Sequence, residues 1–347
     1  MRTEGVGTPT SEFDYQLPDQ AIAQQPLADR SSSRMLVLEQ GGGCRDSRVT
    51  ELPALLRPGD CLVVNDTRVR AARLTGLVGE RPAEVLLLRE MGNFRYVALT
   101  RPAKSLLPGA VIRGIGWRVA VEALWGGHPA GREVRLETDP GVELSEIGEV
   151  PLPPYLKQKL EDPERYQTVY AVGPPVSAAA PTAGLHVTEA LLQEVEDAGV
   201  LISRIQLEVG LATFTPIRTE TIEEHPMHAE RYRISAEAAA RLNGARAAGG
   251  RVVALGTTAV RCLESSPDGD GGVVPGAGET ELYLRPGCRF QVVDGLLTNF
   301  HQPRSSLLVL VSAFYGLDRI RDAYQGALER GYRFLSLGDC MFGWRSA

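Results

Sequence analysis

The sequence lacks the features of membrane, secreted and zinc-thiolate proteins. Its 347 residues contain no apolar run of about eighteen, the length that a membrane-spanning helix needs. Residues 1–11 are polar and lack the charged, apolar and small-residue sections of a signal peptide. The five cysteines are scattered and never form a Cys-x-x-Cys pair, so neither a disulfide framework nor a thiolate zinc site is indicated. We therefore expect a cytoplasmic protein with reduced thiols and no membrane association.

Lysine and net positive charge are also scarce. The formal net charge is −6, and lysine occurs only at positions 104, 157 and 159. Nucleic-acid binders usually carry a basic excess that neutralises phosphates, so any RNA contact must be a local patch. What the sequence does have is length and 43% hydrophobic residues, which suffice for a substantial core and for two domains.

The middle of the chain is rich in short β-type runs, whereas both flanks alternate strand and helix patterns. Six such runs occur at regular spacing, at residues 74–78, 84–88, 94–99, 111–115, 117–124 and 133–136. This spacing predicts a small antiparallel β-barrel. We predict a multi-domain α+β protein, with a discontinuous α/β main domain (residues 1–70 and 151–347) and the barrel inserted at 71–150. Further strands of the main domain are predicted at 280–284 and 290–293.

The stretch 180–188 has the character of a functional loop. Pro181 restricts the backbone, Gly184 tolerates conformations closed to other residues, and Thr188 is a predicted N-cap for the helix that follows. His186 would lie beside the positive end of that helix, where a neutral imidazole able to accept a proton is favoured. The alternative is a helix-entry loop whose histidine is hydrogen-bonded structure.

Polar residues follow several predicted strands. Asn65, Asp66 and Arg68 form a corner that either presents charged groups to a ligand or pairs internally as an Asx turn. Glu208 is an ionisable group in an otherwise apolar run. This indicates that its carboxylate has a bonding partner or a functional role, unless it faces water at the edge of the sheet.

Two further strand ends carry polar groups. The turn Gly256-Thr257-Thr258 offers backbone N–H groups and hydroxyls to an anion such as a carboxylate, or serves only as a helix cap. Asp294, Asn299 and His301 then precede an apolar helix and repeat the order of turn, histidine and capped helix.

The segment His225-Pro226-Met227-His228-Ala229-Glu230 suggests either a metal site or acid–base chemistry. Imidazole and carboxylate are common metal ligands. However, Pro226 disfavours a helical face that would carry both imidazoles, and no third cluster of matching geometry is evident. General acid–base catalysis or substrate hydrogen bonding is the preferred interpretation, and a metal hydrolase using His225, His228 and Glu230 is the alternative.

Ordered blocks along the chain resemble the S-adenosylmethionine:tRNA ribosyltransferase-isomerase family of the queuosine pathway. The blocks are Asn65-Asp66-Thr67-Arg68, 151–155, 166–171, 181–188, 225–230, 256–261, 298–301 and 332–339. The resemblance implies a β-barrel inserted into an α/β domain. It also implies transfer of the ribosyl group of S-adenosylmethionine to 7-aminomethyl-7-deazaguanine at the tRNA wobble position, giving epoxyqueuosine, adenine and methionine.

On this resemblance, no metal and no cofactor beyond S-adenosylmethionine is expected. The tRNA anticodon stem-loop is the expected partner, and the chain is expected to be a monomer or weak homodimer. His186, His228 and Glu230 are the predicted catalytic residues, the two imidazoles for proton transfer and Glu230 for orientation. Both imidazoles are expected in a single cleft. The predicted substrate-binding residues are Asn65, Asp66, Arg68, Thr182, Gly184, Glu208, Thr257, Thr258, Asp294, Asn299 and His301, with Asp294 also orienting the substrate.

Three segments depart from the family pattern. Glu208 begins Glu208-Val209-Gly210-Leu211-Ala212-Thr213-Phe214, where the family usually has histidine. Val176-Ser177-Ala178 stands where Gly-Ser-Val is common, and Val187 replaces an aromatic residue. Two alternatives therefore stay open beside the metal hydrolase: a paralogue that uses the same donor with a free deazapurine or another acceptor, and a non-catalytic RNA-binding relative.

Overall fold

The computed structural model describes residues 7–126, 128–210 and 216–346, and these divide into two compact units. The first unit comprises residues 1–67, 154–172 and 181–347, and the second comprises 68–153 and 173–180. A domain is a part of the chain that can fold independently, and a compact unit need not be one. The domain boundaries predicted at 1–70, 71–150 and 151–347 therefore stay a prediction.

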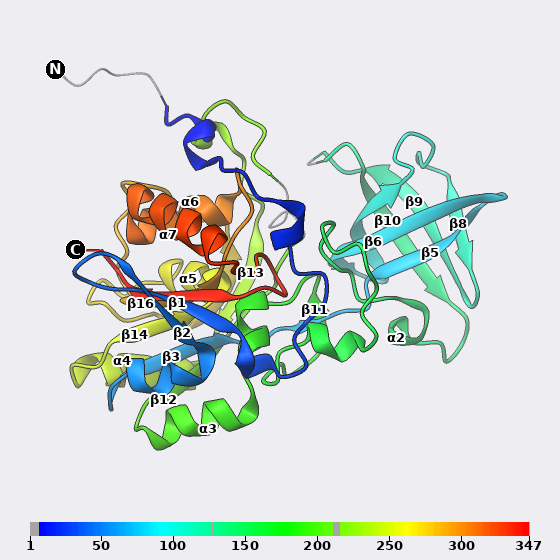
Figure 1. Ribbon diagram of the computed structural model, residues 1–347. Helices are drawn as coiled ribbons and strands as arrows, with labels where there is room; N and C mark the ends of the chain where they lie inside the picture. Colours follow the sequence, from blue (N-terminus) through cyan, green and yellow to red (C-terminus); the bar gives the residue numbers. More distant parts are fainter. Residues whose placement is uncertain (1–6, 127, 211–215, 347) are drawn as a thin grey trace. The chain divides into compact units, whose positions relative to one another are not determined.

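A nine-stranded mixed sheet forms the centre of the first unit, in the order β15-β13-β12-β3-β14-β16-β17-β1-β2 (Figure 1). Its parallel centre consists of β12 (Leu201–Leu207), β3 (Cys61–Asn65), β14 (Val252–Leu255) and β16 (Gly295–Asn299). The outer strands are β15 (Gly276–Thr280), β13 (Glu230–Ile234), β17 (Cys340–Trp344), β1 (Arg34–Leu38) and β2 (Cys44–Arg48). The strands β3, β14 and β16 are buried along their whole length, as parallel strands usually are, whereas β12 exposes Leu201 and Arg204.

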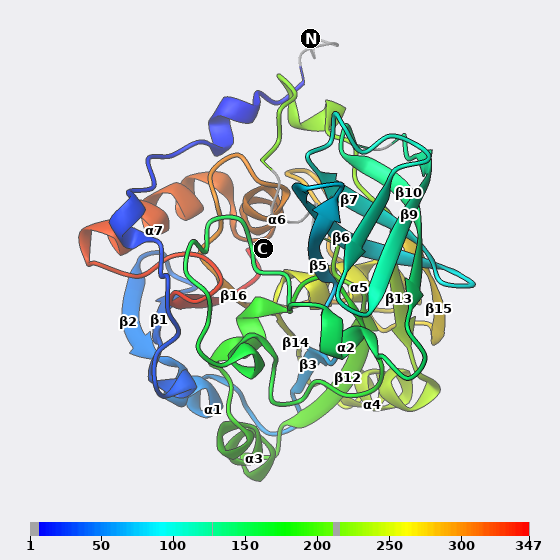
Figure 2. The same ribbon diagram turned by 90° about the vertical axis from the view of Figure 1, so that its right-hand side faces the viewer.

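Helices cover both faces of this sheet. They are α1 (Leu52–Leu55), α3 (Glu189–Asp197), α4 (Ala236–Ala247), α5 (Thr257–Glu264), α6 (Ser306–Tyr315) and α7 (Leu317–Glu329). Figures 1 and 2 both show α6 and α7 on the side opposite α3. The predicted N-cap at Thr188 is confirmed, since its side chain accepts a hydrogen bond from a backbone N–H of the first turn, and Ser235 caps α4 in the same way.

One apolar core explains why the helices α1 and α3 pack where they do. Leu52 of α1 and Leu191 of α3 belong to one buried cluster with alternate residues of the central strands, among them Val64, Leu255 and Leu297. Because strand side chains alternate between faces, the residues between these positions point to the other side of the sheet.

The second unit contains a closed barrel with strand order β10-β7-β6-β5-β8-β9. The strands are β5 (Arg73–Val78), β6 (Arg81–Gly92), β7 (Arg95–Arg101), β8 (Val111–Gly114), β9 (Trp117–Leu124) and β10 (Gly131–Thr138). Every pair is antiparallel. The same unit holds α2 (Leu144–Ile147) and the paired strands β4 (Arg68–Val69) and β11 (Pro175–Ser177). The predicted fold class is confirmed: a mixed α/β sheet and a separate antiparallel barrel.

The two strands predicted at 280–284 and 290–293 are both wrong. The strand β15 already ends at Thr280, and neither 281–284 nor 290–293 forms a strand. The reason is clear for the second segment. The backbone N–H groups of Gln291, Val292 and Val293 donate to the buried carboxylate of Glu264, at 2.8 to 3.0 Å. A carboxylate that binds consecutive N–H groups replaces the ladder that a strand would need, and sequence periodicity does not reveal such a partner.

Candidate active site

Four predicted site segments meet at one edge of the sheet. The central strands β3, β12, β14 and β16 run parallel, so their carboxyl ends lie together. Asp66 follows β3, Glu208 follows β12, Thr257 follows β14 and His301 follows β16. In open α/β sheets, ligands bind in the crevice outside the carboxyl ends of the strands.

The start of α5 is built to receive a negatively charged group. Gly256 has φ 93°, a left-handed conformation that favours glycine, and no side chain caps the helix. The hydroxyl Oγ1 of Thr258 is buried and has no hydrogen-bond partner. Uncapped N–H groups, the positive end of the helix dipole and a free hydroxyl together suit a carboxylate.

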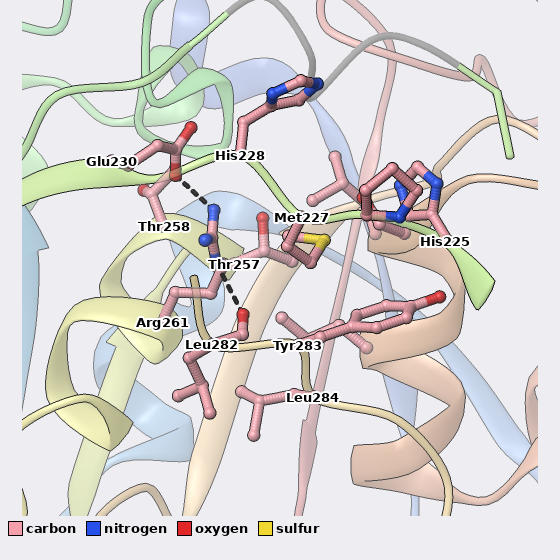
Figure 3. A pocket seen from close by; sticks show the side chains of 14 residues that line it. His225, Met227, His228, Glu230, Thr257, Thr258, Arg261, Leu282, Tyr283 and Leu284 are labelled. Carbon is pink, nitrogen blue, oxygen red and sulfur yellow. Dashed lines mark hydrogen bonds and ion pairs between the residues drawn. The ribbon is translucent and has the colours of Figure 1, made fainter. Parts of the chain in front are cut away.

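A pocket opens beside this helix start (Figure 3). His225 and His228 line it together with both threonines of the Gly-Thr-Thr turn. Burial lowers the pKa of His225, and the neighbouring His228 lowers it further. The remaining lining residues are Pro226, Met227, Glu230, Arg261, Leu282, Tyr283, Leu284, Ser306, Leu307 and Leu310. The pocket is thus lined by both polar and apolar side chains.

Glu230 is held by a buried ion pair. Its side chain accepts a hydrogen bond from Arg261 on one oxygen and from the backbone N–H of Gly210, at 2.8 Å, on the other. Both partners of the pair are buried, with 6% and 7% of their surface exposed. In Figure 3 the Arg261 guanidinium lies between this carboxylate and the backbone of Leu282, to which it donates at 3.2 Å.

No functional role was predicted for Arg261 from the sequence. It lies three residues after Thr258 in α5, a spacing that places both side chains on the same helix face. That spacing from Thr258 is the sequence feature that could have indicated a place for Arg261 at the site.

His186 lies apart from this pocket. It ends the 3₁₀ turn η6 (Thr182–His186), is 3% exposed, and lines a different hollow with Arg30, Ser33 and Ser336. Burial lowers its pKa to about 4, and the charges of Arg333 and Arg30 act in the same direction. The expectation that the rings of His186 and His228 line a single cleft is therefore wrong. The 3₁₀ turn packs the first ring against Ser33, which lies far away in sequence.

A third hollow adjoins both. Thr182, Asn299 and His301 line it, together with Tyr155, Phe300, Gln302, Ser305, Leu307, Leu335 and Ser336. It shares Leu307 with the pocket of His228 and Ser336 with the hollow of His186. The three hollows are thus neighbours along the carboxyl edge, and the two imidazoles belong to its two ends.

Both His301 and Asn299 are tightly held in the third hollow. Nε2 of His301 lies 3.0 Å from the hydroxyl of Thr298, and burial lowers its pKa to about 3. The amide of Asn299 donates to the carbonyls of Leu335 and Ser336, at 3.0 and 3.4 Å, while its Oδ1 has no partner.

Some predicted residues at the carboxyl edge do not line these hollows. Asn65 is fully buried, and its amide both donates to and accepts from the backbone of Leu207 at 3.0 Å. It joins β3 to β12 and has no surface for a substrate. Burial raises the pKa of Asp66 to about 6, against the charge of Arg204.

Asp294 lies at the opposite edge of the sheet. Its carboxylate accepts from Arg246 at 2.7 Å and from the N–H of Val252, the first residue of β14, at 2.8 Å. The sequence could not distinguish the residue before β16 from the residues after it. Arg68 belongs to the second unit.

The remaining predicted positions have local explanations. Gly184 is required because a Cβ there would lie 1.8 Å from the hydroxyl of Tyr170. Val187 is buried in the apolar core. The N–H of Glu208 donates to Arg231 O at 2.8 Å. Of the segment that departs from the family pattern after Glu208, Leu211, Ala212, Thr213 and Phe214 lie outside the described residues.

Within the described ranges, no three His, Cys, Asp or Glu side chains are grouped so that they could hold a metal ion. Among the same residues, none of the helices is both long and apolar enough to cross a membrane.

Comparisons with known proteins agree with the ordered blocks. The family described as queuosine biosynthesis protein matches residues 10–342. The chain is 49% identical over 338 residues to the S-adenosylmethionine:tRNA ribosyltransferase-isomerase of Moorella thermoacetica, covering 95% of this chain and 98% of the relative. It is 47% identical over 339 residues to the enzyme of the same name from Symbiobacterium thermophilum, with the same coverage.

A solved structure is also similar. The crystal structure of S-adenosylmethionine tRNA ribosyltransferase from Thermotoga maritima is 31% identical, with a TM-score of 0.56, over 96% of this chain and 100% of that chain. The family match, the near-complete coverage and the arrangement of blocks at one sheet edge lead to one conclusion: the chain belongs to the S-adenosylmethionine:tRNA ribosyltransferase-isomerase family.

Proposed function

We propose that this enzyme transfers and isomerises the ribosyl group of S-adenosylmethionine onto 7-aminomethyl-7-deazaguanine at the tRNA wobble position. Adenine and methionine leave, and epoxyqueuosine remains in the tRNA. The family relationship supports the reaction. The observation that carries the assignment of the site is the carboxyl edge of the sheet, where segments distant in sequence line three adjoining hollows.

The methionyl carboxylate of S-adenosylmethionine is assigned to the start of α5. Thr257 and Thr258 line the pocket there, and the Thr258 hydroxyl has no other partner. The positive end of the helix dipole stabilises an anion at this position. The apolar lining residues, which include Met227 and Leu310, suit the methylene groups of the methionyl chain of the same ligand.

Proton transfer is assigned to His186 and His228. The sulfonium makes the adjacent C5′ carbon acidic, so an imidazole can remove its proton, and a second group can protonate departing adenine. Because the sulfonium itself supplies this activation, we propose that no cofactor is needed beyond the co-substrate. Glu230 is assigned to orientation, because its carboxylate is already held by Arg261 and Gly210.

The tRNA anticodon stem-loop is the proposed acceptor. We also propose that the enzyme works in the cytoplasm, and that it is a monomer or a weak homodimer. Incubation with S-adenosylmethionine and tRNA that carries the deazapurine tests this directly. We expect adenine release together with a mass gain on the tRNA. Adenine release only with free deazapurine would instead identify a paralogue with another acceptor, and tRNA binding without adenine release would identify a non-catalytic relative.

The carboxylate assignment has a separate test. Thr258→Val removes the unpartnered hydroxyl while keeping the shape of the side chain, and we expect KM for S-adenosylmethionine to rise about tenfold, as for the loss of one charge-assisted hydrogen bond. Ser265→Ala at the C-terminal end of the same helix is the control, because the Ser265 hydroxyl is already partnered by the Arg261 carbonyl at 2.6 Å. An unchanged KM in Thr258→Val would move the carboxylate elsewhere.

A further inference from the structure

Two segments of the first unit are joined by a reciprocal pair of arginines. The guanidinium of Arg30 donates to the backbone carbonyls of Glu164 and Gln167, at 3.1 and 2.8 Å. The guanidinium of Arg165 donates in return to the carbonyls of residues 27 and 28, at 2.5 and 2.9 Å. Each arginine is thus held by the segment that carries the other. Both guanidiniums are therefore fixed in place before any ligand binds.

The positive charges of these two arginines are not balanced by an ion pair. Their side-chain hydrogen bonds go to backbone carbonyls, and among the described residues no carboxylate pairs with either guanidinium. Burial and the charge of Arg165 lower the pKa of Arg30, although Asp162 and Glu164 act in the opposite direction. The carboxylate of Asp162 instead caps a turn, where it accepts from the N–H of Glu164 at 2.9 Å. An anion bound to both arginines would relieve the repulsion between them.

Both arginines line the hollow of His186, where an anion can reach them from solvent. The lining residues Ser33 and Ser336 are each only 3% exposed. Arg30 and Arg165, in contrast, are half-buried. The guanidiniums therefore belong to the accessible part of the lining, and the two serine hydroxyls belong to its buried part.

Each guanidinium keeps hydrogen-bond donors for a ligand. A guanidinium carries five N–H donors, and Arg30 and Arg165 each use two of them for backbone carbonyls. In addition, Nε of Arg165 is buried and has no partner. A planar set of N–H donors binds the oxygens of a phosphate or a carboxylate in bidentate geometry. The arrangement thus favours a small oxyanion over a neutral ligand.

A phosphate of RNA is the oxyanion that best fits the charge and the position of this hollow. With a net charge of −6, the chain can contact RNA only through a local patch of unpaired positive charge. Arg261 at the neighbouring pocket does not offer such a charge, because it is paired with Glu230. The hollow of His186 shares Ser336 with the hollow that Asn299 and His301 line. A nucleotide held here by its phosphate would therefore lie next to the rest of the carboxyl edge.

We propose that the hollow of His186 binds one backbone phosphate of the acceptor tRNA through the guanidiniums of Arg30 and Arg165. This inference rests on the proposed function, in which tRNA carries the acceptor base. Contacts to phosphate carry no sequence information, but they fix the position of a nucleic acid on the protein. The two arginines thus position the anticodon loop along the carboxyl edge.

The salt dependence of tRNA binding tests this proposal. The Kd for tRNA that carries the deazapurine is measured between about 50 and 200 mM KCl. Arg165→Gln should raise Kd about tenfold and make the plot of log Kd against log salt shallower by about 0.7 to 0.9, the value for one neutralised phosphate. Arg30→Gln should act in the same way. Arg165→Lys keeps the charge but loses the planar donors, so Kd should rise while the slope stays.

A purely structural role of the arginines would leave the slope unchanged. The wild-type slope in both Arg30→Gln and Arg165→Gln would therefore overturn the proposal, even if the variants were less stable. Arg241→Gln is the matched control. Its guanidinium also donates to a backbone carbonyl, that of Ile202 at 2.9 Å, but its charge is paired with Glu237 at 3.2 Å. Both Kd and slope should stay at the wild-type values in this control.

Two further measurements distinguish the RNA phosphate from other oxyanions. A raised KM for S-adenosylmethionine in Arg165→Gln, with the wild-type salt slope for tRNA, would assign the hollow to the methionyl carboxylate and overturn the proposal. Inorganic phosphate at constant ionic strength tests for a free ligand. If it raises the melting temperature of the wild type but not of Arg165→Gln, while both have the same salt slope for tRNA, the ligand is free phosphate and the proposal fails.

The failure of this inference is distinguishable from the failure of the proposed function. If the wild-type enzyme releases adenine only with free deazapurine, the proposed function fails and this inference fails with it. If the wild type modifies tRNA while both glutamine variants keep its Kd and its salt slope, the proposed function stands and only the phosphate site fails.

Discussion

The imidazoles at the two ends of the carboxyl edge differ in burial and in their contacts. At one end, His186 is nearly inaccessible, and its hydrogen bond to Ser33 fixes the ring. At the other end, His228 is half-buried and lines an open pocket beside the paired charges of Glu230 and Arg261. A buried neutral ring suits one defined proton transfer, whereas a more exposed ring can exchange its proton with solvent between turnovers.

The difference also concerns how each end is stabilised. The end of His228 depends on a buried ion pair, which is sensitive to the loss of either partner. The end of His186 depends on close packing and on hydrogen bonds to backbone carbonyls. Substitutions at Glu230, Gly184 and His301 should therefore change stability by different amounts.

Removal of the charge on Glu230 should have the largest effect. Glu230→Gln leaves the Arg261 guanidinium buried without its counterion, and we expect a loss of about 3 kcal/mol in the free energy of unfolding, measured by urea denaturation. Glu279→Gln is the matched control, because Glu279 forms an exposed ion pair with Arg231 at 3.4 Å on the neighbouring strand. That change should cost less than about 1 kcal/mol. Equal losses would show that the buried pair has no special importance.

The close packing next to His186 is tested at Gly184. A Cβ at this position would lie 1.8 Å from the Tyr170 hydroxyl, so we expect Gly184→Ala to lower the free energy of unfolding by about 2 kcal/mol. Tyr170→Phe in the same chain removes the clashing oxygen and should recover part of that loss. If the double variant is as unstable as the sum of the two single variants, the clash is not the cause.

Buried neutral histidines should make stability depend on pH. The pKa of His301 is lowered to about 3 and that of His186 to about 4, below the value of 6.5 for an unperturbed ring. Between about pH 6.5 and 4 the unfolded chain binds protons that the folded chain does not, so stability falls as the pH falls. His301→Gln should flatten this loss by about 1 to 2 kcal/mol at pH 5. His128→Gln, at an exposed ring, is the control, and an unchanged slope in His301→Gln would contradict the burial argument.

More of the fold than of the site could be predicted from the sequence. The β-runs of the barrel and the N-cap at Thr188 depend on local patterns, and all of them formed. The predicted strand at 290–293 failed because the distant carboxylate of Glu264 takes its N–H groups. Patterns within a short window cannot anticipate a partner from another element.

The same limit explains the site. The polar residues after β3, β12, β14 and β16 gather at one edge because these strands run parallel. The role of Asn65 as a link between strands, the place of Asp294 at the far edge and the contact of His186 with Ser33 all depend on tertiary contacts. Ser33 and His186 are separated by 153 positions, and no local signal joins them.

Single-turnover adenine release from S-adenosylmethionine, with tRNA that carries the deazapurine, tests the central claim most directly. The claim is that a buried neutral imidazole at the carboxyl edge takes the substrate proton. His186→Gln should slow release at least about a hundredfold while the protein stays folded and binds tRNA, whereas His128→Gln on the barrel should match the wild type. A folded His186→Gln enzyme with a wild-type rate would contradict the account.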